Sequence, residues 1–341
     1  MNPGAAFAED LGDGRVRCGL CPHECVIKPG KVGVCSTRRN DEGVLSVLTH
    51  GRLRAVAVDP IEKKPLSHYR PGSETFSVAS VGCNLKCPFC QNHSLSQALR
   101  DESPTVAESG RRWSAEEIVA AAVGQHCASI SFTYSEPILS FEIARDVAAL
   151  AKPQEVEIVF VTNGQVNPGP ARELAGFIAA ANVDLKCFSA KDYTDVLGGS
   201  LEAVTQAIEI FKGGGVWVEV TTLVVPGFND GDDQLGAIAA FLAGIDPAIP
   251  WHVSRFHPDY KWLERPATPP ATLERAREIG RQAGLRYVYT GNIPGDDGEK
   301  THCPKCEDVV IDRVGYFVRE VRTETGHCPS CGEAIEGVGL R

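Results

Sequence analysis

The chain has 341 residues, of which 43% are apolar, so it is long enough to bury a large core or to form two or three domains. Its formal net charge of −10 disfavours nucleic-acid binding, which needs a basic surface, and no apolar run reaches the roughly 20 residues that span a bilayer. The first residues lack the basic and apolar regions of a signal peptide, so we expect a cytoplasmic protein without nucleic-acid or membrane partners.

The composition predicts three parts along the chain. Residues 1–43 form a Gly-rich and polar N-terminal segment with four cysteines and little periodicity. Residues 44–295 hold lead-in strands followed by a long run of regular elements. Residues 296–341 carry two further cysteine pairs around a strand-like stretch, so we expect a small C-terminal domain there.

From Thr75 onward, apolar β-rich runs alternate with amphipathic helical patterns, which is typical of parallel βα units. The expected strands cover residues 76–82, 129–135, 156–163, 182–187, 216–225, 251–256 and 287–291. The expected helices cover residues 116–126, 201–211, 233–244 and 271–284. Ser114 and Glu117 form a capping box before the first helix, and residues 100–112 are predicted to be a polar loop. This pattern predicts an α/β fold, a partial TIM-like (β/α)6 barrel with its site at the C-terminal ends of the strands.

Thirteen cysteines are many for a cytoplasmic protein, and eleven of them fall into three clusters. In a reducing compartment such clusters usually bind metal instead of pairing as disulfides. The clusters are Cys18, Cys21, Cys25 and Cys35; Cys83, Cys87 and Cys90; and Cys303, Cys306, Cys328 and Cys331. Cys127 and Cys187 stand alone, and we expect them to be small buried side chains.

The central cluster has the spacing Cys-x3-Cys-x2-Cys within the segment GCNLKCPFCQN. Thiolates are the usual ligands of iron–sulfur clusters, normally in sets of four. Three ligands in one short loop predict a [4Fe–4S] cluster whose fourth iron is open to a substrate group. A zinc knuckle is the alternative, but knuckles prefer paired Cys-x2-Cys halves and no second half lies nearby.

This motif resembles the radical SAM (S-adenosylmethionine) superfamily, and DLKCFSAKDY and FHPDYK resemble glycyl-radical activating enzymes such as the pyruvate formate-lyase activating enzyme. A closer resemblance is to the AmmeMemoRadiSam system radical SAM enzymes. The segments that carry it are residues 18–25, 133–137, 250–261, 287–295 and 303–331. The resemblance covers nearly the whole chain, and it implies SAM as cofactor and reductive cleavage to a 5′-deoxyadenosyl radical.

The resemblance also implies a set of SAM contacts, most of them at the ends of the expected strands. The implied residues are Phe89, Glu136, Asn163, Asp184, Lys186, Val225 and His257. Five of them have a structural alternative: a surface charge for Glu136, a turn at Asn163, a buried ion pair between Asp184 and Lys186, and a structural role for His257. Arg255 is a candidate for neutralising a carboxylate.

The two outer clusters are predicted to bind metal. Cys303-x2-Cys306 and Cys328-x2-Cys331 flank alternating strand-like residues, which is typical of a zinc ribbon; a rubredoxin-like iron is the rival. The N-terminal cysteines fit either zinc or an auxiliary iron–sulfur cluster, with His23 as a possible substitute ligand, and the opening Cys-x2-Cys favours zinc. A small segment with almost no core needs such a metal to fold.

The function predicted from these features is hydrogen abstraction from a protein or peptide by a radical SAM enzyme that receives electrons from a donor such as ferredoxin or flavodoxin. A radical SAM enzyme for a small molecule is one alternative. A non-catalytic iron–sulfur and zinc protein is another, although an electron carrier gains nothing from an open iron. The chain lacks an eight-cysteine insertion after the central motif, so it resembles only the activating enzymes without one.

Overall fold

The computed structural model describes residues 4–293 and 295–340 and divides the chain into two compact units. Each unit is built from separate stretches of sequence. The first contains residues 1–58, 75–179 and 190–216, and the second contains residues 59–74, 180–189 and 217–341. The division into residues 1–43, 44–295 and 296–341 stays a prediction.

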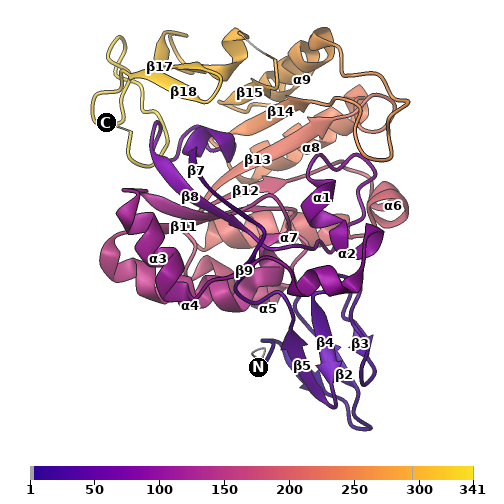
Figure 1. The fold of residues 1–341 in the computed structure, drawn as a ribbon. Helices are drawn as coiled ribbons and strands as arrows, with labels where there is room; N and C mark the ends of the chain where they lie inside the picture. The colour runs from indigo at the N-terminus through magenta and orange to yellow at the C-terminus, as the bar shows by residue number, and fades with distance from the viewer. Residues whose placement is uncertain (1–3, 294, 341) are drawn as a thin grey trace. The chain divides into compact units, whose positions relative to one another are not determined.

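The first unit contains parallel strands covered by helices (Figure 1). Its strands follow the order β7 (Ala55–Pro60), β8 (Glu74–Ala79), β10 (Ser129–Phe132) and β11 (Glu157–Thr162). Its main helices are α3 (Ala115–Gly124), α4 (Phe141–Ala151), α5 (Pro168–Ala175) and α7 (Leu201–Gly213). The capping box before α3 is confirmed, because Ser114 and Glu117 exchange side-chain to backbone hydrogen bonds of 2.8 and 3.2 Å.

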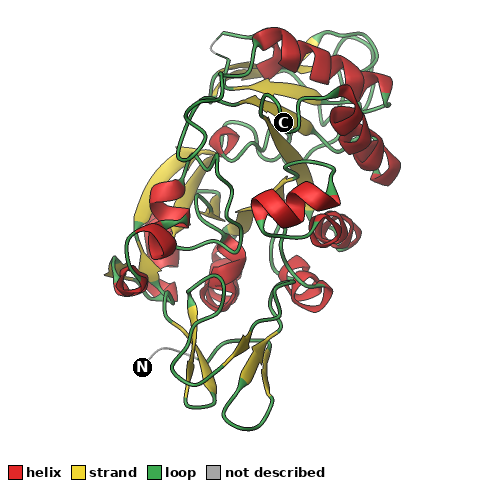
Figure 2. Cartoon of the chain, turned by 90° about the vertical axis from the view of Figure 1, so that its right-hand side faces the viewer, coloured by secondary structure: helices red, strands yellow, loops and turns green. Residues whose placement is uncertain are grey.

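The N-terminal cysteines belong to a group of short antiparallel strands in the same unit, which Figure 2 shows as narrow hairpins near the N-terminus. These are β1 (Ala8–Asp10), β2 (Val16–Cys18), β3 (Val26–Ile27), β4 (Arg38–Asp41) and β5 (Val44–Val47). A bidentate ion pair of 2.9 and 3.0 Å joins Arg38 of β4 to Glu142 of α4, with both side chains buried. This ion pair connects the N-terminal hairpins to helix α4.

The second unit repeats the parallel βα arrangement and adds a small antiparallel sheet near the C-terminus. Its parallel strands are β12 (Ala180–Asp184), β13 (Trp217–Val224), β14 (Trp251–Arg255) and β15 (Val288–Gly291). Helices α8 (Asp232–Ile245) and α9 (Pro270–Gln282) connect successive strands. The antiparallel strands are β16 (Thr301–His302), β17 (Val309–Val314) and β18 (Phe317–Val321).

The expected α/β fold with parallel strands is confirmed, and all seven expected strands are present within a few residues of their predicted limits. The loop predicted at residues 100–112 is wrong. This region holds the end of α2 (Ala98–Asp101), a 3-10 turn (Pro104–Glu108) and β9 (Arg111–Arg112), which pairs with β6 (Arg52–Leu53). Leu99 and Ala107 explain the difference, because they are buried in one apolar cluster and so hold the polar segment against the unit.

The remaining elements are short. They are α1 (His93–Ser96), α6 (Ala190–Asp192), a π-helical turn (Tyr193–Leu197) and 3-10 turns at Ile61–Lys63, Pro137–Ser140, Lys152–Gln154 and Asp297–Glu299. Within the described residues, every helix is too short or too polar to cross a membrane.

Candidate functional site

The central cysteines lie on the loop that leaves the C-terminal end of β8 and enters α1. Gly82 opens this loop with a φ of 108°, and a Cβ there would meet the Thr37 side chain at 2.6 Å, so the turn requires glycine. Cys87 is buried, whereas Cys83 and Cys90 are half-buried. The loop thus presents three thiols from one short stretch at the strand end where parallel α/β folds carry function.

Polar groups surround the sulfur atoms of this loop. The Leu85 N–H and the Asn163 side-chain amide donate to Cys83 Sγ at 3.3 and 3.4 Å, and the Cys90 Sγ lies 3.0 Å from the Ser96 hydroxyl. Burial, the charge of Glu136 and the neighbouring Cys87 raise the pKa of the Cys83 thiol. A free thiolate is therefore disfavoured at Cys83 unless a cation neutralises it, as a ligated iron does.

Arg100 of α2 holds the backbone of the cysteine loop. Its guanidinium donates to the Leu85 carbonyl at 2.5 Å and to the Cys83 carbonyl at 3.0 Å, and the Gln97 side chain adds a second hydrogen bond to the Leu85 carbonyl at 3.2 Å. Asn84 extends the anchoring by donating to the Gln165 carbonyl at 2.8 Å. Sequence analysis missed Arg100, because its spacing from the motif carries no signal and only the fold of α2 brings it back.

We expect the substitution Arg100→Ala to loosen the cysteine loop without unfolding the chain, because it removes hydrogen bonds from a charged donor to two loop carbonyls. Such bonds are each worth about 1.5–3 kcal/mol. Iron content of anaerobically purified protein, and the rate at which a chelator extracts that iron, measure the effect. The exposed Arg172 on α5 gives a matched control, and equal iron retention in both variants contradicts the assignment.

Glu136 lies just beyond β10 and is buried. Its carboxylate accepts hydrogen bonds from the Thr162 hydroxyl at 2.6 Å, the Asn163 N–H at 2.9 Å and the Ile138 N–H at 3.1 Å. The structure therefore brings Glu136, Asn163 and Cys83 into one network within the first unit. The alternative of a surface charge at Glu136 does not hold, and contact of these residues with SAM stays a prediction.

The predicted contacts of the second unit lie at the ends of its own strands. Asp184 and Lys186 form an ion pair of 2.8 Å at the end of β12. Val225 follows β13, and its N–H is already donated to the Asn229 side chain at 2.6 Å. His257 follows β14 and is exposed. Phe89, by contrast, belongs to the first unit and is buried beside the motif cysteines.

Comparisons with known proteins agree with the motif. The model of the radical SAM superfamily matches residues 77–241. An uncharacterized protein of Methanocaldococcus jannaschii, MJ0808, is 41% identical over 97% of this chain and 98% of its own length. The chain belongs to the radical SAM superfamily. The benzylsuccinate synthase activating enzyme of Thauera aromatica is 25% identical over 40% of this chain and 46% of its own length. The structure of SuiB from Streptococcus suis bound to SAM aligns with a TM-score of 0.49 and 16% identity, over 67% of this chain and 52% of that one.

Membership in the superfamily implies a [4Fe–4S] cluster and SAM, and the central loop fits the cluster. Among the described residues, only the C-terminal cysteines form a group of three or more whose ligand atoms all lie within 4.8 Å of one another. At least two of the sulfur atoms of Cys83, Cys87 and Cys90 are therefore more than 4.8 Å apart, which is wider than the ligands of a single ion. A multinuclear cluster needs this wider spacing, since each thiolate binds a different iron.

The C-terminal cysteines of this radical SAM protein lie closer together than the central cysteines and have the spacing of a single-ion site. The sulfur atoms of Cys303 and Cys331 are 3.6 Å apart, and so are those of Cys306 and Cys328. Four thiolates about 2.3 Å from a single tetrahedral ion lie at nearly this separation. The group is therefore complete for one ion and leaves no open position.

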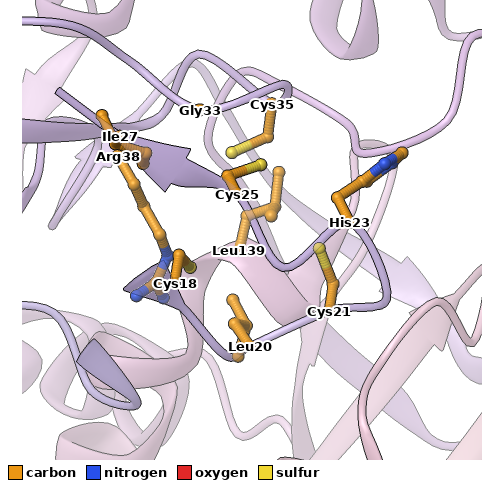
Figure 3. Close-up of a pocket in the computed structure, with 10 residues that line it drawn as sticks. All are labelled: Cys18, Leu20, Cys21, His23, Cys25, Ile27, Gly33, Cys35, Arg38 and Leu139. Atoms are coloured by element: carbon orange, nitrogen blue, oxygen red, sulfur yellow. The ribbon is translucent and has the colours of Figure 1, made fainter. Parts of the chain in front are cut away.

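The N-terminal cysteines line a small cavity, which Figure 3 shows enclosed by all four side chains. Apolar side chains of Leu20, Ile27 and Leu139 close its walls. The Val34 N–H donates to Cys25 Sγ at 3.4 Å, and burial raises the pKa of Cys21 to about 12. Since this group also fails the 4.8 Å spacing of a single-ion site, its geometry resembles the central loop more than the C-terminal group.

Proposed function

We propose that the protein binds a [4Fe–4S] cluster through Cys83, Cys87 and Cys90 and uses SAM to remove a hydrogen atom from a substrate. The observation that carries this proposal is a loop of three widely spaced thiols at the end of a parallel strand, with hydrogen bonds directed to their sulfur atoms. When bound, the reduced cluster supplies the electron that splits the sulfur–C5′ bond of SAM and gives a 5′-deoxyadenosyl radical.

Residues of this chain would hold the reactants in place. Glu136 and Asn163 are fixed next to Cys83, so they are positioned to bind the amino and carboxylate groups of SAM beside the cluster. Asp184 and Lys186 offer one charge of each sign for the ribose and carboxylate. Phe89, Val225 and His257 complete the proposed SAM contacts, and the partial (β/α)6 barrel is part of the same proposal.

The finer assignment is an AmmeMemoRadiSam system enzyme that acts on a protein or peptide and receives electrons from ferredoxin or flavodoxin. The distant likeness to the benzylsuccinate synthase activating enzyme supports a protein target. A small-molecule substrate remains the rival within the superfamily. The three-thiol loop argues against a non-catalytic carrier, since a carrier has no use for an open iron.

Anaerobic reconstitution with iron, sulfide and dithionite tests the proposal. The reduced protein should give a [4Fe–4S]+ EPR signal that changes when SAM is added, and it should release 5′-deoxyadenosine slowly without substrate. An EPR signal that is indifferent to SAM would overturn the proposal, because an open iron must sense a bound amino acid group.

The outer cysteine groups are proposed to hold different metals, a structural zinc at Cys303, Cys306, Cys328 and Cys331 and an auxiliary iron–sulfur cluster at Cys18, Cys21, Cys25 and Cys35. The sulfur spacings support this division. A rubredoxin-like iron at the first site and a zinc at the second are the competing assignments.

Metal analysis separates these assignments when the central cysteines are absent. In a chain with Cys83, Cys87 and Cys90 replaced by alanine, we expect about one zinc, from the C-terminal site, and about four irons, from the N-terminal cluster. Adding Cys25→Ala and Cys35→Ala should remove the iron and leave the zinc. Two zinc ions and no iron in the first variant would show that the N-terminal group is a zinc site.

A further inference from the structure

The second unit contains a cavity of about 330 Å³ that the proposed SAM chemistry does not use. Its walls come from β14, β15, the segment of residues 62–67 and the turn between β17 and β18. Pockets of this size suit small organic ligands. The side chains that line it are mostly polar, with the exposed ring of Tyr316 at the rim.

One wall carries a histidine held by a buried carboxylate. Glu219 is fully buried, and it accepts hydrogen bonds from the N–H groups of Ser67, His68 and the Trp217 indole at 2.8–2.9 Å. His252 Nε2 lies 2.6 Å from the same carboxylate. Although burial raises the pKa of Glu219, the hydrogen bonds that it accepts from His252 and the Trp217 indole hold that pKa below its usual value, so the carboxylate is ionised.

This arrangement fixes the tautomer of His252. An ionised carboxylate can only accept, so Nε2 carries a hydrogen, and whenever the ring is neutral its lone pair is on Nδ1. No described residue donates to Nδ1, and Nδ1 is not one of the buried side-chain atoms that lack a hydrogen-bond partner, so it keeps some access to solvent. Since His252 lines the cavity and 8% of its side chain is accessible, this acceptor faces the cavity.

A second chain of hydrogen bonds makes the wall rigid. Arg313 donates to the Thr301 hydroxyl, Thr301 donates to Tyr289, and Tyr289 donates to His68 Nε2. His68 Nδ1 in turn donates to a backbone carbonyl at 2.6 Å, and burial lowers the pKa of His68 to about 4, so this ring stays neutral. The Tyr289 ring stacks on His252 at 5.1 Å, which keeps the imidazole in place.

The charged side chains around the cavity indicate which net charge a ligand can carry. Two carboxylates, Glu62 and Glu299, and one guanidinium, Arg313, line it. Glu62 Oε2 and Arg313 Nε are buried and have no hydrogen-bond partner among the described residues, although the two side chains form an ion pair of 3.7 Å. Buried polar atoms rarely stay unpaired, so these atoms indicate a missing partner. The surplus of carboxylates disfavours an anion.

We propose that this cavity is a binding site for a small organic molecule with a neutral or cationic N–H donor group, which His252 Nδ1 accepts while Glu219 holds the ring. The site does not depend on the proposed radical chemistry. Its test therefore uses the protein without SAM or reductant, and its failure would leave the cluster assignment untouched.

Three probes of equal size test the selectivity. Benzamidine offers cationic donors, benzamide offers a neutral donor, and benzoate offers only acceptors and a negative charge. In anaerobic protein labelled with ¹⁵N-histidine, we expect His252 to show the Nε2–H tautomer and its Nδ1 resonance to move on titration with benzamidine or benzamide, but not with benzoate. Absence of a response to both donors, or equal binding of benzoate, would overturn the proposal.

The substitution His252→Gln moves the acceptor away from the Nδ1 position, because the glutamine NH2 can still donate to Glu219 while its carbonyl oxygen lies beside that NH2 and not across a ring from it. We expect binding of benzamidine to weaken by about tenfold or more with an unchanged unfolding midpoint. Tyr316→Ala, at the exposed rim, should weaken the binding of benzamidine and of benzamide alike. Wild-type affinity in His252→Gln would show that Nδ1 is not the acceptor.

Discussion

Replacing Cys83, Cys87 and Cys90 together by alanine is expected to abolish both the SAM-sensitive EPR signal and the release of 5′-deoxyadenosine. The three thiols are the complete protein ligand set of the proposed cluster, and they lie on one loop anchored by Arg100 and Asn84. With no thiolate left, no iron is held where SAM would bind. High-performance liquid chromatography of the nucleoside product measures the loss, which should reach the level of a protein-free sample.

The solitary cysteines Cys127 and Cys187 provide the matched control. Both are buried thiols distant in sequence from the three clusters, so their joint replacement by alanine tests whether cysteine loss in general inactivates the chain. That control should keep the EPR signal and the product. Cleavage of SAM by the triple alanine variant would mean that a different group of cysteines supports the reaction.

The substitution Glu142→Gln is expected to destabilise the protein by about 3–5 kcal/mol, because it leaves the buried Arg38 guanidinium without a counter-charge. Both side chains are almost inaccessible, so water cannot solvate the unpaired cation. The carboxylate also accepts from the Ala6 N–H at 2.8 Å, and this bond connects the first strands to α4. A lower urea midpoint and faster proteolysis within residues 4–47 should report the change.

Two variants decide whether the buried charge causes this loss. Asp195→Asn breaks the exposed Lys191–Asp195 pair on the surface and should leave the urea midpoint nearly unchanged, because solvent screens this pair. The double variant Arg38→Met and Glu142→Met removes both charges and should recover much of the stability lost in Glu142→Gln. If the double variant is less stable than the single one, the pair contributes net stability and our explanation fails.

The strands were predictable because they are rich in apolar and β-branched residues, as in the run at residues 158–160, which is typical of strands buried on both faces. Helices α4 and α5 were not assigned from the sequence. Helix α5 carries start signals in Asn167 and Pro168, but Gly169 and Pro170 then interrupt its helical pattern, and α4 follows directly on a 3-10 turn that obscures its start. Their assignment depends on packing against the strands.

The site was only partly predictable for a related reason. Spacing alone located the three cysteines, because their ligand geometry is local in sequence. Arg100 and the Glu219–His252 pair could not be found in this way, since the atoms they contact are brought close only by the fold. No sequence pattern indicates that a glutamate and a histidine 33 residues apart, on neighbouring strands, form a hydrogen bond.

Residues 67–68 can form their full set of hydrogen bonds only late in translation. The backbone N–H groups of Ser67 and His68 donate to Glu219. The Ser67 carbonyl accepts a hydrogen bond from Arg313, which is 246 residues further along the chain. At ribosomal speeds of about 5–20 residues per second, this partner emerges roughly 10–50 s later. The second unit therefore cannot finish folding during most of translation, and an early stop before Arg313 should yield a protease-sensitive product.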